Sequence, residues 1–172
     1  MSPGAFAFIA IALFMIHEFD EIIFIRRYID ERADDERCAT EMFIAAAGDY
    51  PSTESIAAGI CEGFIVATLI LAIGIILGSV ETIAATFIVH ALHLIAHIRE
   101  ALVFPGWAPG SRTAVLTSPL VAATLWAAFA AFSINYPLLI VLTVVIGAAL
   151  LVNLGLLHRL AGGIDESISK AV

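Results

Sequence analysis

The amino-acid sequence predicts an all-α fold, a polytopic membrane helix bundle of about five transmembrane helices in one domain over residues 1–172. Hydrophobic residues make up 61% of the chain and charged residues only 14%, and the mean hydropathy is +1.01. Soluble domains carry about 25% charged residues, so this composition is typical of a membrane protein. We therefore expect a multi-pass protein of the cell membrane, with the lipid bilayer as its main partner.

The charge balance and the cysteine content exclude two other classes. The net charge is -8 and no basic patch is present, which argues against nucleic-acid binding. The two cysteines, Cys38 and Cys61, do not indicate a disulfide framework. The N-terminus lacks the charged start and the cleavage site of a signal peptide, so we interpret it as a retained first transmembrane helix.

Apolar runs long enough to cross a membrane predict the helices in order. The first apolar run contains a short polar segment. A polar loop of mixed charge over 29–53 follows this run. A turn at Gly48–Ser52 precedes the second helix, and a rigid turn at Phe104–Gly110 separates the third from the fourth. Pro119 should kink the fourth helix or mark its buried start. The expected helices lie at about 4–28, 54–78, 82–104, 112–133 and 137–158.

Glycines form a stripe on the second helix. Two Gly-x-x-x-Gly pairs in phase predict that a neighbouring helix approaches closely. A second copy of the chain is one candidate for that neighbour, so a homo-oligomer is an expected partner. The stripe consists of Gly59, Gly63, Gly74 and Gly78.

Basic residues predict the topology. With five spans, all eight Lys and Arg residues lie on one side of the membrane, after helices one, three and five and before helix four. The positive-inside rule makes that side cytoplasmic. We therefore expect the N-terminus outside and the C-terminus in the cytoplasm.

The segment His17-Glu18-Phe19-Asp20-Glu21 places one imidazole and three carboxylates inside the first apolar run. On a helix, His17 and Glu21 share a face, which Asp20 borders. An acid costs about 2.5 to 3.5 kcal/mol near the centre of a membrane helix, and each flanking Phe, Ile or Leu returns only about 0.3 to 0.6 kcal/mol. These groups should therefore face a metal, a polar partner or water inside a bundle.

The third helix carries a second polar group, in which His90, His93, His97 and Glu100 fall within a stripe about 80° wide. A single membrane histidine is usually structural, but three on one stripe favour a metal or proton-handling site. Glu62 of the second helix lies at a similar depth, so we expect the polar groups to meet in one layer. The candidate metal ligands are His17, Asp20, Glu21, Glu62, His93 and His97.

The chain resembles the HXXEE-domain family, a group of small integral membrane proteins. The family motif is a histidine followed three and four residues later by acids, which His17, Asp20 and Glu21 fit, with Asp20 in place of a glutamate. The resemblance continues where a helix with a histidine precedes an aromatic-x-Pro-Gly turn and a Thr-Ala helix start. Here these features are His97, Trp107-Ala108-Pro109-Gly110 and Thr113-Ala114. The resemblance implies no particular activity.

The leading functional hypothesis is an intramembrane enzyme that uses zinc, iron or manganese and acts on a lipid or another apolar substrate. In a di-metal version, Glu21 and Glu62 bridge two ions. In a mononuclear hydrolytic version, His17-Glu18-x-x-Glu21 imitates half of a zinc motif, Glu18 activates water, and Glu18 and Glu21 are the catalytic residues. The alternatives are a small proton or metal-ion transporter, and a structural or accessory membrane protein.

Overall fold

Helices account for all the regular structure in residues 1–45 and 52–171, the parts of the chain that the computed structural model describes. The prediction of an all-α protein is confirmed. The α-helices are α1 (Pro3–Arg32), α2 (Met42–Ala45), α3 (Thr53–Ile76), α4 (Val80–Val103), α5 (Ser111–Ala131) and α6 (Tyr136–Ala171), with a short 3-10 helix at Glu36–Cys38.

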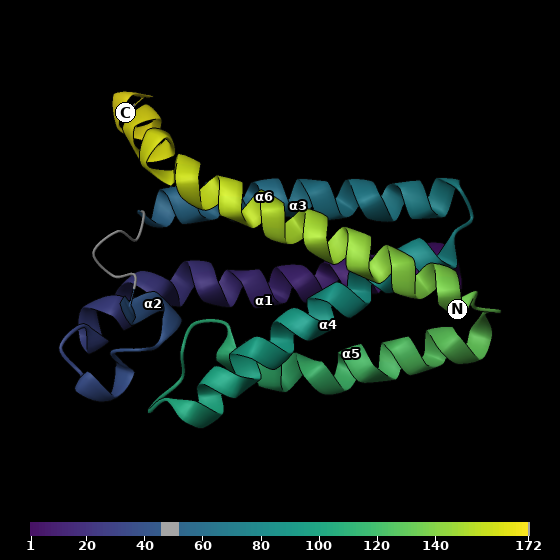
Figure 1. Cartoon of the computed structure of the whole chain (residues 1–172), viewed down its shortest axis with the longest axis horizontal. Helices are drawn as coiled ribbons and strands as arrows, with labels where there is room; N and C mark the ends of the chain where they lie inside the picture. Colours follow the sequence, from purple (N-terminus) through teal and green to yellow (C-terminus); the bar gives the residue numbers. More distant parts are fainter. Residues whose placement is uncertain (46–51, 172) are drawn as a thin grey trace.

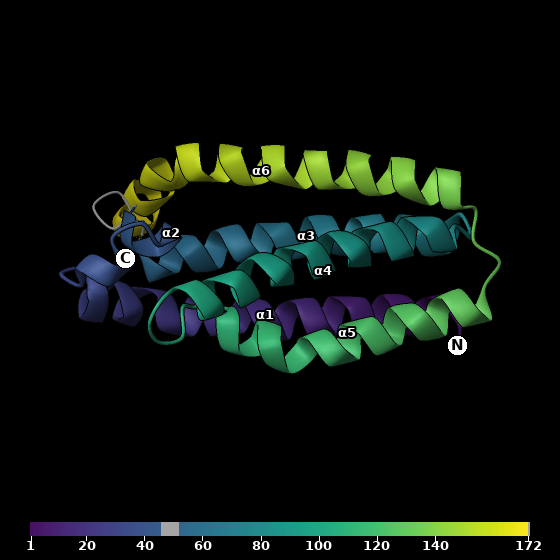
Figure 2. The ribbon, with the colours of Figure 1, turned by 60° about the horizontal axis from the view of Figure 1, so that its bottom comes forward.

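The five long helices run back and forth along one axis (Figure 1). The N-terminus and the turns after α3 and α5 lie at one end of the bundle. The residues after α1, the turn between α4 and α5, and the C-terminus lie at the other end, which we call the basic end because the Lys and Arg residues lie near it. Figure 2 shows α6 on one side, α3 and α4 in the middle, and α1 and α5 on the other side.

Four of the described helical segments are long and apolar enough to cross a membrane: α3, α4, α5 and Tyr136–Leu157 of α6. A multi-pass membrane protein is therefore plausible. The first helix, α1, is not among these four, and it is the helix that carries the segment of one histidine and three acids.

The boundaries of three helices differ from the sequence prediction. Whereas we predicted that the first helix ends near residue 28, α1 continues to Arg32, where ion pairs spaced four residues apart, such as Arg27 Nε to Glu31 Oε1 at 2.7 Å, stabilise the extension. α6 continues past the predicted end at residue 158 to Ala171. α3 ends at Ile76 rather than 78, because Gly78 adopts a φ of 65° that ends the helix.

The predicted glycine stripe is used unevenly within the chain. A Cβ atom at Gly74 would lie 2.9 Å from Cγ1 of Ile83, so this glycine lets α4 approach α3 closely. A Cβ atom at Gly63 would meet nothing within 4 Å, and one at Gly59 would only touch Leu157. A homo-oligomer through the stripe remains a prediction.

The residues that follow α1 pack with its last turns into a small folded unit at the basic end. Its apolar members include Tyr28, Cys38 and Phe43. The buried Glu41 closes the unit, because its Oε2 accepts hydrogen bonds from the backbone N–H groups of Phe43 and Ile44, both at 3.0 Å. Burial raises the pKa of the Glu41 carboxyl, and these two hydrogen bonds oppose the rise. The turn predicted at Gly48–Ser52 lies, apart from Ser52, outside the described residues.

Candidate metal centre

His17 of α1 is held by the start of α5. Its Nδ1 lies 3.2 Å from Oγ1 of Thr113, and that hydroxyl donates its own hydrogen to the carbonyl oxygen of Gly110 at 3.0 Å. The hydroxyl is therefore left to accept, so Nδ1 of His17 carries the proton and Nε2 offers a lone pair. Nε2 is buried and has no hydrogen-bond partner within the described residues.

His97 of α4 is oriented in a similar way by a carboxylate one turn further along. Its Nδ1 lies 3.3 Å from Oε2 of Glu100, which leaves Nε2 pointing toward α1. An imidazole whose far nitrogen faces a carboxylate is the usual arrangement of a metal-binding histidine. His93 lies one turn before His97 on the same face, and the two Nε2 atoms are 3.2 Å apart.

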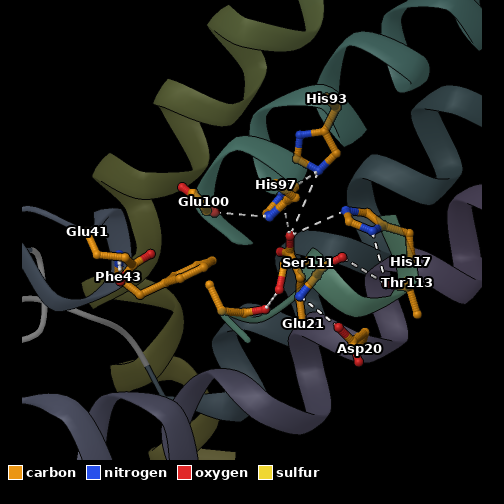
Figure 3. A network of polar contacts seen from close by, with 12 residues as sticks. His17, Asp20, Glu21, Glu41, Phe43, His93, His97, Glu100, Ser111 and Thr113 are labelled. Carbon is orange, nitrogen blue, oxygen red and sulfur yellow. Dashed lines mark hydrogen bonds and ion pairs between the residues drawn. The ribbon is translucent and has the colours of Figure 1, made fainter. Parts of the chain in front are cut away.

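Four side chains bring one ligand atom each to a common point (Figure 3). The ligand atoms of His17, Glu21, His93 and His97, which we call the quartet, all lie within 4.8 Å of one another. Oε1 of Glu21 lies 3.0 Å from Nε2 of His97, 3.6 Å from Nε2 of His17 and 3.9 Å from Nε2 of His93.

The contacts of Oε1 of Glu21 lie near the spacing of a metal site, although the quartet as a whole, with ligand atoms within 4.8 Å of one another, is wider than an occupied site. Ligand atoms about 2.0 to 2.1 Å from a tetrahedral metal lie roughly 3.3 Å from one another. Moreover, Nε2 of His17 and Oε1 of Glu21 are both buried and make no hydrogen bond within the described part of the chain. Buried polar atoms that make no hydrogen bond are costly, and a cation bound between the imidazole nitrogens and the carboxylate oxygen would satisfy both atoms. The quartet can therefore hold a metal ion.

The turn before α5 forms one wall of the site. Gly110 has a φ of 77°, and a Cβ atom there would lie 2.9 Å from Cε1 of His17 and 3.0 Å from both Oε1 of Glu21 and Cε1 of His97. Only glycine fits this conformation in this space without strain. Sequence reasoning noticed the Pro-Gly turn through the family pattern but assigned Gly110 and Thr113 no role.

Asp20, a predicted ligand, has another partner. Its Oδ2 accepts a hydrogen bond from the backbone N–H of Gly110 at 2.8 Å. The carboxylate thus fixes the turn against α1, and Asp20 is not a member of the quartet. This hydrogen bond ties Asp20 to the turn that borders the ligands.

Glu62 is not brought to the quartet either. Its Oε2 accepts a hydrogen bond from Nδ2 of Asn153 at 2.8 Å, so α6 supplies its partner. The predicted depth of Glu62 did not specify which way it faces around α3. Glu18, by contrast, adjoins the quartet, with its Oε1 3.9 Å from Nε2 of His93.

Two further histidines were singled out by the sequence. His90 lies one turn before His93 and is buried, and neither ring nitrogen has a hydrogen-bond partner within the described residues. Its ring packs edge-on against His17 and Phe14, with centroid separations of 5.8 and 5.7 Å, and stacks on Phe87. The side chain of His158 lies outside what the structure describes.

The quartet is exposed on one side. The side chains of His17 and His97 are 0% and 2% exposed, and that of Glu21 is 14% exposed. The side chain of His93 is 42% exposed. A molecule that reaches the four ligands would therefore approach past His93.

Comparison with known proteins gives one match. A family model described as "Protein of unknown function with HXXEE motif" matches residues 8–124, which contain the whole quartet and the turn at Gly110. No curated protein and no solved structure matches the chain.

Proposed function

The chain belongs to the HXXEE family, whose function is unknown, and we propose that it is an intramembrane metal-dependent enzyme that acts on a lipid or another apolar substrate. The observation that carries the proposal is the quartet. Three imidazoles and one carboxylate from two helices converge within 4.8 Å, and two of the imidazoles are oriented by Thr113 and Glu100.

The ligand set suits zinc, iron or manganese, because imidazole and carboxylate ligands are common to all three. The position of Glu62 favours the mononuclear version of the enzyme over the di-metal version. A second ion would need Glu62 as a bridge, and Glu62 is bonded to Asn153 instead. A catalytic site needs an open coordination position beside its protein ligands. With four protein ligands, manganese would keep such a position because it accepts six ligands, whereas zinc would have to expand to five.

A bound divalent cation supplies Lewis-acid chemistry and makes a coordinated water acidic. Glu18 would receive a proton there. This role is supported by its Oε1, which lies 3.9 Å from Nε2 of His93, and by its side chain, which is only 9% exposed. Glu21 contributes its negative charge as a ligand. We assign Glu18 as the general base on this geometry.

We further propose that α1 is a fifth span, with the N-terminus outside and the basic end in the cytoplasm. A helix of 30 residues is about 45 Å long, enough to cross the hydrocarbon core and extend beyond it. The positive-inside rule then orients the bundle. The quartet lies below the membrane surface in this arrangement, which favours an apolar substrate.

A second candidate function is a carrier of protons or metal ions. The observation in its favour is that titratable groups continue along α4 on both sides of the quartet, to His90 in one direction and Glu100 in the other. In a carrier, protons or metal ions would pass along this line of groups. In an enzyme, the metal ion would remain bound to the quartet.

Elemental analysis of protein purified in detergent tests the proposal. We expect about one equivalent of a transition metal in the wild type and in Glu62→Ala, and none in His97→Ala. Metal-loaded and chelator-treated protein should then be incubated with a membrane lipid extract and compared by mass spectrometry. Conversion of a lipid only by loaded protein supports an enzyme. Absence of metal from freshly purified and from reloaded wild type would contradict it.

A further inference from the structure

A small pocket lies at the basic end, between the last turns of α1 and the start of α5. Its volume is about 160 Å³, and its lining includes Asp20, Phe24, Arg27, Glu31, Trp107 and Arg112. Pockets that enclose a whole drug-sized molecule measure roughly 300 to 1,000 Å³. This pocket therefore fits a small polar group rather than an entire lipid.

Of the two arginines that line the pocket, only Arg27 forms a close ion pair within the described part of the chain. Arg27 is paired with Glu31, whose Oε1 lies 2.7 Å from its Nε. The carboxylate of Asp20 accepts the N–H of Gly110. The guanidinium of Arg112 lies over the ring of Phe24, 5.3 Å from its centroid. It interacts electrostatically with Asp20, but it forms no ion pair within 4.0 Å among the described residues.

The chemistry of Arg112 selects the ligand. A guanidinium presents N–H groups in a planar fork that matches the oxygens of a phosphate, and the contact with the Phe24 ring holds the Arg112 guanidinium at the pocket. Trp107 also lines the pocket and is 49% exposed. Tryptophan and arginine are enriched at the level of lipid headgroups, which is where the proposed topology places this end of the bundle.

The pocket adjoins the quartet through a single residue. The N–H of Gly110 bonds to Asp20, which lines the pocket, while the α-carbon of Gly110 faces His17, Glu21 and His97. The pocket and the metal ligands are therefore both linked to the turn at Gly110.

We propose that the pocket binds a phosphate-bearing group through Arg112, and that this group is the headgroup of the lipid on which the enzyme acts. The second part rests on the proposed function, whereas binding itself does not require the metal. Inorganic phosphate offers the same chemistry, so the two sources must be compared directly.

Tryptophan fluorescence provides the test, because the chain contains two tryptophans and only Trp107 lines the pocket. In full-length Trp126→Phe protein in detergent, Trp107 emission is followed during titration with dihexanoyl phosphatidic acid, dihexanoylglycerol and inorganic phosphate. We expect a saturable response to phosphatidic acid and none to dihexanoylglycerol. Tighter binding of phosphatidic acid than of inorganic phosphate supports a lipid headgroup as the ligand. Equal binding of the two would show that the pocket recognises phosphate alone, and would contradict the second part of the proposal.

Matched variants complete the test. Arg112→Ala should weaken binding of phosphatidic acid roughly ten- to a hundredfold, the loss expected for hydrogen bonds to a charged group. Arg112→Lys keeps the positive charge and should weaken the binding of phosphatidic acid less. It is the control for a folding defect in Arg112→Ala. Arg26→Ala, outside the pocket and near Asp30, should change nothing. His97→Ala should lose metal but keep binding, which separates this proposal from the metal site. An equal response to dihexanoylglycerol, or full affinity in folded Arg112→Ala, would overturn it.

Discussion

Helices α1 and α4 meet in two different ways along their length. Toward the end opposite the basic end, Phe6 of α1 packs edge-on against Phe87 of α4, with ring centroids 5.8 Å apart, inside the larger apolar core. Three turns further along α1, His17 faces His93 and His97 of the same partner helix, with ring centroids 5.0 and 4.8 Å apart.

The two regions satisfy different requirements. The apolar contact depends on volume and shape, so many hydrophobic residues can fill it. The polar contact depends on defined partners, because a buried imidazole or carboxylate without one is costly. The apolar region therefore accounts for the fold, and the polar region is where function should be sought. The first three of the following changes each affect one region and should spare the other, and the fourth lies outside both.

The largest effect is expected in the polar region. His17→Ala and His97→Ala should each abolish metal binding, and the double variant should cost little more than either single one, because ligands of one ion act as a unit. His90→Ala, which removes the neighbouring imidazole, should retain metal. Metal stoichiometry of the four proteins measures this. Retention of full metal by the double variant would end the ligand hypothesis.

Gly110→Ala should have the next largest effect. The added Cβ atom would lie within 3.0 Å of three ligand side chains at a φ of 77°, so we expect metal affinity to fall roughly ten- to a hundredfold, as for other supporting residues. The matched control is Gly63→Ala, where a Cβ atom meets nothing within 4 Å. Competition with a chelator measures both affinities. Equal affinities would contradict the role of the turn.

Phe6→Ala should produce the reverse pattern. Phe6 is 0% exposed in the apolar core, and its truncation should lower the free energy of unfolding by on the order of 3 kcal/mol. Below the unfolding temperature the variant should still bind one metal. Thermal unfolding in detergent combined with metal analysis tests this. Loss of metal from the folded variant would show that the two regions are not separable.

The smallest effect concerns the loop after α1. Hydrogen bonds from Arg37 lower the pKa of the Asp35 carboxyl from 3.8 to about 2. Since the pKa is depressed in the folded state, this contact stabilises the loop above pH 3.8 and is lost as the pH falls through about 2. Arg37→Ala should raise the titration midpoint of Asp35 toward 3.8 without changing metal content. NMR titration of the carboxyl carbon measures it, and an unshifted midpoint would contradict the contact.

Much of this architecture follows from the sequence alone. Apolar runs of about 20 residues predict the long helices, and the four-residue spacing of His17 with Glu21 and of His93 with His97 predicts two ligand pairs. The high cost of unpartnered polar groups in a bilayer predicts that the pairs meet. Six ligands were predicted. Their three histidines and one of their acids, Glu21, form the quartet.

Other features depend on tertiary packing that local patterns do not encode. The depth of Glu62 follows from counting residues, but its partner depends on how α3 is rotated and on where α6 packs, which brings Asn153 to it. Asp20 has the right spacing for a ligand, yet Gly110, 90 residues away in sequence, takes its carboxylate. The wall formed by Gly110 requires both a left-handed backbone and a close approach, and neither is visible in residue spacing.

The most direct test of the central claim is X-ray absorption spectroscopy at the edge of the metal that copurifies with the wild-type protein, or of zinc added to it. If the quartet holds the ion, the spectrum should show three imidazole nitrogens and at least one oxygen in the first shell, at about 2.0 to 2.2 Å for zinc. His93→Ala should remove one imidazole from that shell. A first shell of oxygen atoms with no imidazole, or one unchanged in His93→Ala, would contradict the account.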